Sequence, residues 1–98
     1  MHVWDVVFKT KSPAAKPLID FLKQHVGWPE PYAELDVEIL VPMDGPSGRI
    51  IVRHRFPDMA TEERAWAAWT APPKAEEFFA GISEYVEGWD VSRYRVDE

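Results

Sequence analysis

The chain has 98 residues, which suits one domain with its own hydrophobic core, and its 46% hydrophobic and 29% charged residues are typical of a globular protein. It contains no cysteine, which excludes disulfides and thiolate metal sites, and its net charge of −6 argues against binding a nucleic-acid backbone. The first twelve residues lack the apolar core of a signal peptide and no run is long enough to span a membrane, so we expect a cytoplasmic protein without a membrane partner.

Residues 1–9 predict a strand that is apolar on both faces. Such a strand usually lies in the middle of a sheet, where both of its faces are covered. Asp5 interrupts one of the two faces. One face carries Trp4, Val6 and Phe8, and the other carries Val3 and Val7 beside Asp5.

A helix is expected after the connector at residues 12–17. Proline is tolerated in the first turn of a helix and costly deeper inside, so Pro17 places the helix start near Lys16. Gly27 is a suitable residue to end it, and the prolines at 29 and 31 prevent its continuation. The expected apolar stripe consists of Leu18, Phe21, Leu22 and Val26 or His25.

Two strand-like runs between Leu35 and Phe56 predict a hairpin closed by the loop at residues 42–48. Pairing Glu38 with Arg53 gives one nearly apolar face and one face with two opposite-charge pairs, and a slip by one residue would place charges in the core. The charged face pairs Asp36 with Arg55, Glu38 with Arg53 and Leu40 with Ile51. The apolar face pairs Leu35 with Phe56, Val37 with His54, Ile39 with Val52 and Val41 with Ile50.

A second helical region follows the hairpin in two pieces. Asp58 or Thr61 can cap the first piece, whose apolar stripe includes Ala65, Trp66 and Trp69. The prolines at 72 and 73 break this helix. A second piece is expected from Lys74 to Glu87, ended by Gly88, and a last strand from Trp89 to Val96. The adjacent glutamates at 62–63 and 76–77 are interpreted as solvated helix faces.

The order β-α-β-β-α-β predicts an α+β, ferredoxin-like domain over residues 1–98, with a four-stranded antiparallel sheet in the order 4-1-3-2 and the helices on one face. The other face would then mix aliphatic side chains with acids and arginines. Such a face is too apolar to leave in water as one patch. A second copy or a ligand could cover it, and we expect a homodimer because two-fold homodimers are common.

The segment from Phe56 to Trp69, followed by Pro72-Pro73, resembles the second-helix region of NIPSNAP-like proteins. These belong to the dimeric α+β barrel superfamily, together with the antibiotic-biosynthesis-type monooxygenases. The resemblance implies a homodimer whose two sheets face each other, with a cleft between sheet and helices in each subunit. Its members include haem-degrading and quinone-forming monooxygenases, decarboxylases, isomerases and proteins without known activity.

The residues argue against a haem or metal cofactor. Haem degradation in this superfamily implies an Asn, a Trp and a His around the cleft, and the chain has no Asn and no His after His54. The three histidines, His2, His25 and His54, lie on separate predicted elements without ligand spacing. We therefore expect no cofactor and no metal site.

His54 is the candidate catalytic residue, because it falls on the apolar face of the hairpin beneath the helices. There it could act as a general base whose pKa burial has shifted, or it could be a core histidine with one satisfied hydrogen bond. Trp66, Trp69, Tyr85 and Phe79 are the candidate ligand-binding residues, and Trp4 and Trp28 could also line a pocket or belong to the core.

Two hypotheses of function remain open. In the first, the protein binds a small hydrophobic or aromatic molecule in the cleft, with cofactor-independent monooxygenase-type oxidation or proton transfer at His54 conceivable. In the second, the protein is a catalytically silent structural or interaction dimer whose own side chains fill the cleft. A connected cavity that reaches His54 would favour the first hypothesis, and a packed core the second.

Overall fold

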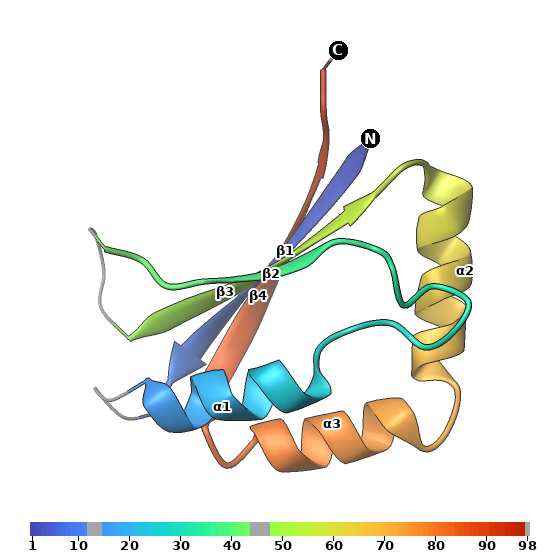
Figure 1. Cartoon of the computed structure of the whole chain (residues 1–98). Coiled ribbons are helices and arrows are strands. Elements are labelled where there is room, and N and C mark those ends of the chain that lie inside the picture. The colour runs from blue at the N-terminus through green and yellow to red at the C-terminus, as the bar shows by residue number, and fades with distance from the viewer. Residues whose placement is uncertain (12–14, 44–47, 98) are drawn as a thin grey trace.

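The computed structural model describes residues 1–11, 15–43 and 48–97, and it contains one four-stranded antiparallel sheet. The strands are β1 (His2–Thr10), β2 (Val37–Leu40), β3 (Arg49–Phe56) and β4 (Val86–Arg95). Their order is β2-β3-β1-β4, which confirms the predicted ferredoxin-like topology with the first strand in the interior of the sheet (Figure 1). The sheet is open and does not close into a barrel within the chain.

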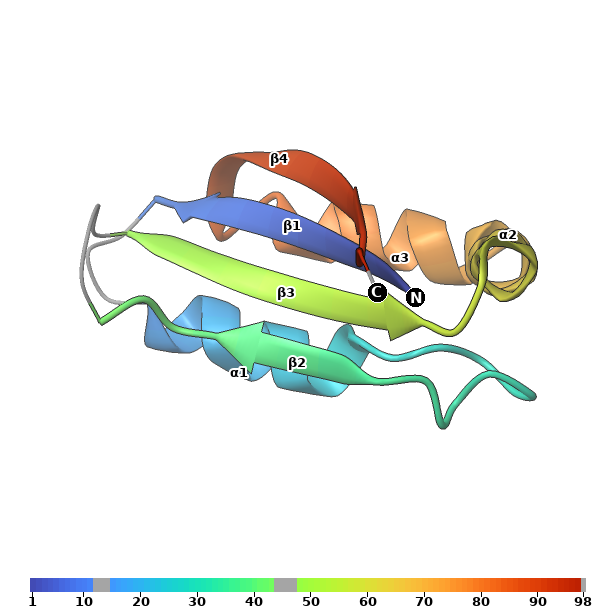
Figure 2. The same cartoon turned by 90° about the horizontal axis from the view of Figure 1, so that it is seen from above.

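The described residues form three helices, two of which lie on one side of the sheet and one at its end (Figure 2). They are α1 (Lys16–His25), α2 (Met59–Thr70) and α3 (Lys74–Ile82). The predicted start near Lys16 is confirmed, and Asp58 caps α2 because its Oδ1 accepts a hydrogen bond from the Thr61 N–H at 2.7 Å. Figure 1 shows α1 and α3 below the sheet and α2 running across its end. None of the helices in the described ranges is long and apolar enough to cross a membrane.

The hairpin has the predicted register. Glu38 lies opposite Arg53, and Val37 lies opposite His54. The expected pairing of Val41 with Ile50 is wrong, because β2 ends at Leu40 and Val41 is 54% exposed. The loop expected at residues 42–48 and the connector at 12–17 lie partly outside the described residues.

The last helix is shorter than predicted. It ends at Ile82 and not at Glu87, and Gly88 lies inside β4 instead of ending the helix. Backbone pairing explains the difference, because Gly88 lies opposite Lys9 in the β1–β4 ladder. The hydrogen bonds of the sheet thus take precedence over a local apolar pattern that continued to Val86.

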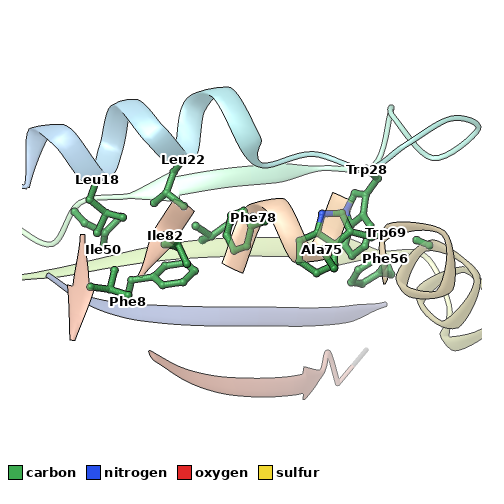
Figure 3. Close-up of a cluster of buried hydrophobic side chains, with 13 residues drawn as sticks. Phe8, Leu18, Leu22, Trp28, Ile50, Phe56, Trp69, Ala75, Phe78 and Ile82 are labelled. Carbon is green, nitrogen blue, oxygen red and sulfur yellow. The ribbon is translucent and has the colours of Figure 1, made fainter. Parts of the chain in front are cut away.

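The core lies between the sheet and the helix layer (Figure 3). Leu18 and Leu22 of α1 and Ile82 of α3 are at most 1% exposed, as are Ile50, Val52 and Phe56 of β3. The helix-facing side of the predicted hairpin is therefore the buried side. Burial of each such side chain contributes roughly 1.5–3 kcal/mol, so this face supplies much of the stability of the domain.

Candidate functional site

A cavity of about 220 Å³ lies between the sheet and the helices. Its walls are almost entirely apolar and come from both layers. For scale, an engineered apolar cavity of about 150 Å³ is large enough to bind benzene. The lining residues are Trp4, Val6, Phe8, His25, Val26, Gly27, Trp28, Val52, His54, Trp66, Trp69, Phe78, Phe79 and Val91.

His54 stands on the covered face of β3 between two tryptophans. Its ring centroid is 6.0 Å from that of Trp4 and 5.4 Å from that of Trp28, both in edge-to-face arrangements. Burial lowers the pKa of His54 to about 4, and the nearby charge of Asp5 opposes this shift only in part. The imidazole is therefore neutral at pH 7.

Three ring nitrogens of residues that line this cavity are buried without a hydrogen-bond partner among the described residues. They are Nε1 of Trp4, Nε1 of Trp28 and Nδ1 of His54. Buried polar groups in proteins are nearly always hydrogen-bonded, and leaving one unpaired costs about 1–3 kcal/mol. These nitrogens are enclosed by the packed rings and do not face the cavity, whose walls are almost entirely apolar.

One side of the cavity opens to the surface through aromatic side chains. Trp66 and Phe79 are both cavity residues and are each 40% exposed. Trp66 packs edge-on against Trp4, at 4.8 Å between ring centroids. Phe79 stacks on Trp89 of β4 at 5.6 Å. Aromatic rings thus extend from the protein surface into the cavity.

The structure brings four of the five predicted site residues together. His54, Trp66, Trp69 and Phe79 all line the cavity. Tyr85 does not, and its placement there is corrected. Since α3 ends at Ile82, Tyr85 belongs to the turn before β4 and packs against Phe21, at 5.4 Å between ring centroids.

Glu62 was expected on a solvated helix face, and this expectation is wrong. Glu62 is 4% exposed and forms an ion pair with Arg93 of β4, and its Oε2 lies 3.3 Å from Nδ1 of His2 of β1. The pattern of the last strand held the missing signal. Arg93 lies on the same face of β4 as Val91, the face that the helices cover, so a carboxylate from the helix layer can pair with it.

The uncovered face of the sheet carries the paired charges. Arg53 donates two hydrogen bonds to Asp5, both at 2.8 Å, and this contact lowers the pKa of Asp5 and raises that of Arg53. Arg55 forms an ion pair with Glu38. The predicted side-chain pairs Glu38–Arg53 and Asp36–Arg55 are therefore wrong, although the backbone register is right.

The position of Arg53 on β3, between β1 and β2, explains why it pairs with Asp5 and not with Glu38. Arg53 lies opposite both Glu38 on β2 and Asp5 on β1. Asp5 is 7% exposed, so a bidentate pair with it is less solvated and stronger than one with the more exposed Glu38. A hollow of about 330 Å³ is formed on this face by Val3, Asp5, Arg53, Arg55 and Tyr94.

The described ranges hold no group of three or more His, Asp or Glu side chains that could bind a metal ion. His2, His25 and His54 lie on β1, α1 and β3, and His25 and His54 both line the cavity.

Comparisons with known proteins identify the fold. No protein-family model and no curated protein sequence matches the chain. An uncharacterised NIPSNAP domain protein from Burkholderia xenovorans has a similar structure, with a TM-score of 0.77 and 10% identity over 99% of this chain and 95% of that one. A NIPSNAP family protein from Agrobacterium tumefaciens has a TM-score of 0.73 and 8% identity, over 99% of this chain and 93% of that one.

The chain has the ferredoxin-like fold of NIPSNAP domain proteins. A dimeric protein of unknown function from Bacteroides fragilis, described as having a ferredoxin-like fold, shares it with a TM-score of 0.63 and 16% identity, over 97% of this chain and 96% of that one. At these identities the similarity extends to the fold and not to the activity. The resemblance seen in residues 56–73 is thus confirmed at the level of architecture.

Proposed function

We propose that the protein is a cytoplasmic homodimer that binds a small hydrophobic or aromatic molecule in the cavity between sheet and helices. The single observation that carries this proposal is the apolar cavity of about 220 Å³ that reaches His54. A structural module whose core was filled by its own side chains would have no such cavity. Ligand sites are concave, mostly apolar and supplied with a few polar groups, and this cavity has those properties.

The dimer is supported by the uncovered face of the sheet. Val3, Val7 and Ile51 lie there beside the Asp5–Arg53 pair, and all three are partly exposed in the single chain. Covering these aliphatic groups with the same face of a second copy would remove them from water and keep the ion pairs satisfied. The dimeric Bacteroides protein of the same fold supports a dimer. In the arrangement that we propose, the two sheets would form the predicted barrel.

His54 is the residue of the cavity that could take part in a reaction. A neutral imidazole with a pKa of about 4 is a weak proton acceptor at pH 7 but a good hydrogen-bonding group. If the bound molecule reacts, by cofactor-independent oxidation or by proton transfer, His54 is the residue that would polarise it. Trp66, Trp69 and Phe79 would supply apolar walls.

Tryptophan fluorescence tests the proposal, because four of the five tryptophans line the cavity. The purified dimer is titrated with naphthalene, phenols, aromatic ketones and quinones. We expect saturable changes in emission with at least one of these classes. No response to any of them by the folded protein would contradict ligand binding and leave the catalytically silent dimer as the better description.

A pair of variants localises the binding. Val91→Phe adds bulk at a cavity residue that is 50% exposed, so it should weaken binding without preventing folding. Val96→Phe adds the same bulk at a residue that is 41% exposed and lies outside the cavity, so it should leave binding unchanged. Equal effects of the two variants would place the ligand elsewhere.

A further inference from the structure

We infer that the molecule bound in this cavity is apolar and longer than the cavity, and that its outer part lies on exposed side chains beside the opening. This inference rests on the proposed function, because it adds to the same site a binding surface outside the cavity. We call this surface the outer strip. It consists of Trp66 of α2, Phe79 of α3, and Trp89 and Val91 of β4.

The side chains of the outer strip are large, apolar and exposed. Trp66 and Phe79 are each 40% exposed, Trp89 is 42% exposed and Val91 is 50% exposed. A single exposed apolar side chain is common on protein surfaces, whereas a contiguous group of them marks a surface that binds another molecule. The outer strip is such a group.

The outer strip is continuous with the cavity. Trp66, Phe79 and Val91 line the cavity, and Trp89 stacks on Phe79 at 5.6 Å between ring centroids. Trp89 also packs against the cavity residue Phe8, at 6.3 Å between ring centroids. A ligand can therefore extend from the cavity onto Trp89 and remain in contact with apolar side chains along its whole length.

The size and polarity of the site limit the ligand. The cavity volume of about 220 Å³ exceeds the roughly 150 Å³ that accepts a benzene ring, so the cavity is suited to about two fused rings. A molecule that ended there would leave the outer strip in water. The cavity lining and the outer strip include no Lys, Arg, Asp or Glu among the described residues, so the part of the ligand that they contact should be apolar.

The proposed dimer does not cover the outer strip. The dimer interface is proposed on the uncovered face of the sheet, around Val3 and Val7. Trp89 and Val91 lie on the other face of β4, beside the helices, because the β1–β4 register places them opposite residues of the covered face of β1. The ligand of the adjoining cavity is therefore the partner that we assign to the outer strip.

Naphthalene and 2-butylnaphthalene test this inference, because they share two fused rings and differ only in an apolar chain. Their affinities for the wild-type dimer are measured by calorimetric or NMR titration. A fully buried methylene group raises affinity about fourfold, and one that keeps one side in water raises it about twofold. We therefore expect 2-butylnaphthalene to bind about 10- to 20-fold more tightly than naphthalene.

A variant assigns this gain to the outer strip. Trp89→Ser removes the one side chain of the strip that does not line the cavity. It should weaken 2-butylnaphthalene binding by about fivefold and leave naphthalene binding unchanged. Met43→Ser is the control, because Met43 is an apolar residue that is 97% exposed and lies outside the cavity, and it should change neither affinity.

An NMR measurement on the wild type makes the test independent of variant folding. At saturation, nuclear Overhauser effects should connect the terminal methyl group of bound 2-butylnaphthalene with the indole protons of Trp89. Their absence would overturn the inference while the proposed function stood. The same conclusion would follow if 2-butylnaphthalene bound more weakly than naphthalene, or if Trp89→Ser kept the full gain in affinity.

Two further outcomes separate this inference from its alternatives. If Trp89→Ser raised the dissociation constant of the dimer, a second copy would cover the outer strip, and the inference would be overturned. Failure of both compounds and of the wider aromatic panel to bind would overturn the proposed function itself.

Discussion

The two faces of the sheet differ in whether their polar side-chain atoms have partners. On the uncovered face, Asp5 and Arg53 satisfy each other through two hydrogen bonds, and Arg55 pairs with Glu38. On the helix-covered face, the ring nitrogens of Trp4, Trp28 and His54 are buried without partners among the described residues. These charged groups of the uncovered face are therefore paired with one another, whereas the three ring nitrogens of the covered face have no partner among the described residues.

This difference separates two kinds of recognition. A self-complementary face with internally paired charges and intervening aliphatic side chains suits a second copy of the same chain. A hollow apolar layer suits a small hydrophobic molecule. The same strands contribute to both faces, because successive residues of a strand point to opposite faces.

The largest expected effect comes from placing a charge in the middle of the uncovered face. Ile51 lies there, opposite Val7 on one side and Leu40 on the other. Ile51→Asp should raise the dissociation constant of the dimer by at least about 100-fold, because it buries an unpaired carboxylate in the interface. Analytical ultracentrifugation measures this change.

The control for this experiment is Met59→Asp, which places the same charge on an exposed residue in the first turn of α2. A carboxylate is favourable at a helix N-terminus, so dimerisation should be unaffected. If the Ile51 variant dimerised as tightly as the wild type, the uncovered face would not be the interface.

The next effect distinguishes the two ion pairs of the uncovered face. Asp5→Ala should lower the free energy of unfolding by about 2 kcal/mol, because it leaves Arg53 without its bidentate partner. Glu38→Ala should cost less than about 1 kcal/mol, because the Glu38 side chain is 46% exposed. Urea unfolding of both variants measures the two losses of unfolding free energy. Equal losses would show that the more buried ion pair is not the stronger one.

The covered face should respond to pH through His54. Its pKa is lower in the folded state than in the unfolded state, about 4 against 6.5, so the unfolded chain binds the proton more tightly. Stability is thus full above about pH 6.5 and falls as the pH decreases toward 4. Between pH 7 and pH 5 we expect a loss of about 2 kcal/mol that is absent in His54→Gln.

Urea unfolding at several pH values measures this loss, and the difference between wild type and variant removes the contribution of the carboxylates that titrate in both. His25→Gln, at an exposed histidine, is the control and should retain the pH dependence of the wild type. If the wild type and His54→Gln lost stability equally, the imidazole would not be buried as described.

The smallest effect tests how tightly the helix layer packs away from the cavity. A Cβ atom at Gly81 of α3 would lie 2.6 Å from Cε2 of Phe21, whereas one at Gly88 of β4 would meet no atom within 4 Å. Gly81→Ala should therefore destabilise the protein by about 1 kcal/mol, although alanine favours helix formation. Thermal unfolding should show no such loss for Gly88→Ala, and equal behaviour of the two would mean that α1 and α3 pack loosely.

Period-two patterns allowed the sheet to be predicted. The pairing of Glu38 with Arg53 and the burial of Ile50, Val52 and Phe56 follow from alternation along the hairpin, because any other register places charges in the core. The starts of α1 and α2 were equally predictable, since Pro17 and Asp58 act on the chain locally. His54 could be placed on the covered face for the same reason.

Contacts between distant segments were not predictable in this way. In the backbone register, Arg53 lies opposite both Asp5 and Glu38. It pairs with Asp5 because Asp5 is the more buried of the two acids. The end of α3 at Ile82 depended on the pairing of β4 with β1, which removed Tyr85 from the predicted site. Glu62 was misjudged because its partner Arg93 is 31 residues away in the sequence.

By itself the sequence determined the order of the elements, the register of the hairpin and the face on which each strand residue lies, because these follow from the spacing of neighbouring residues. Only the tertiary structure decided which charges pair, and that Trp4, Trp28 and His54 line one cavity. A cavity is the space that remains between packed elements. Its shape depends on how α1, α2 and α3 sit against the sheet, which no local pattern encodes.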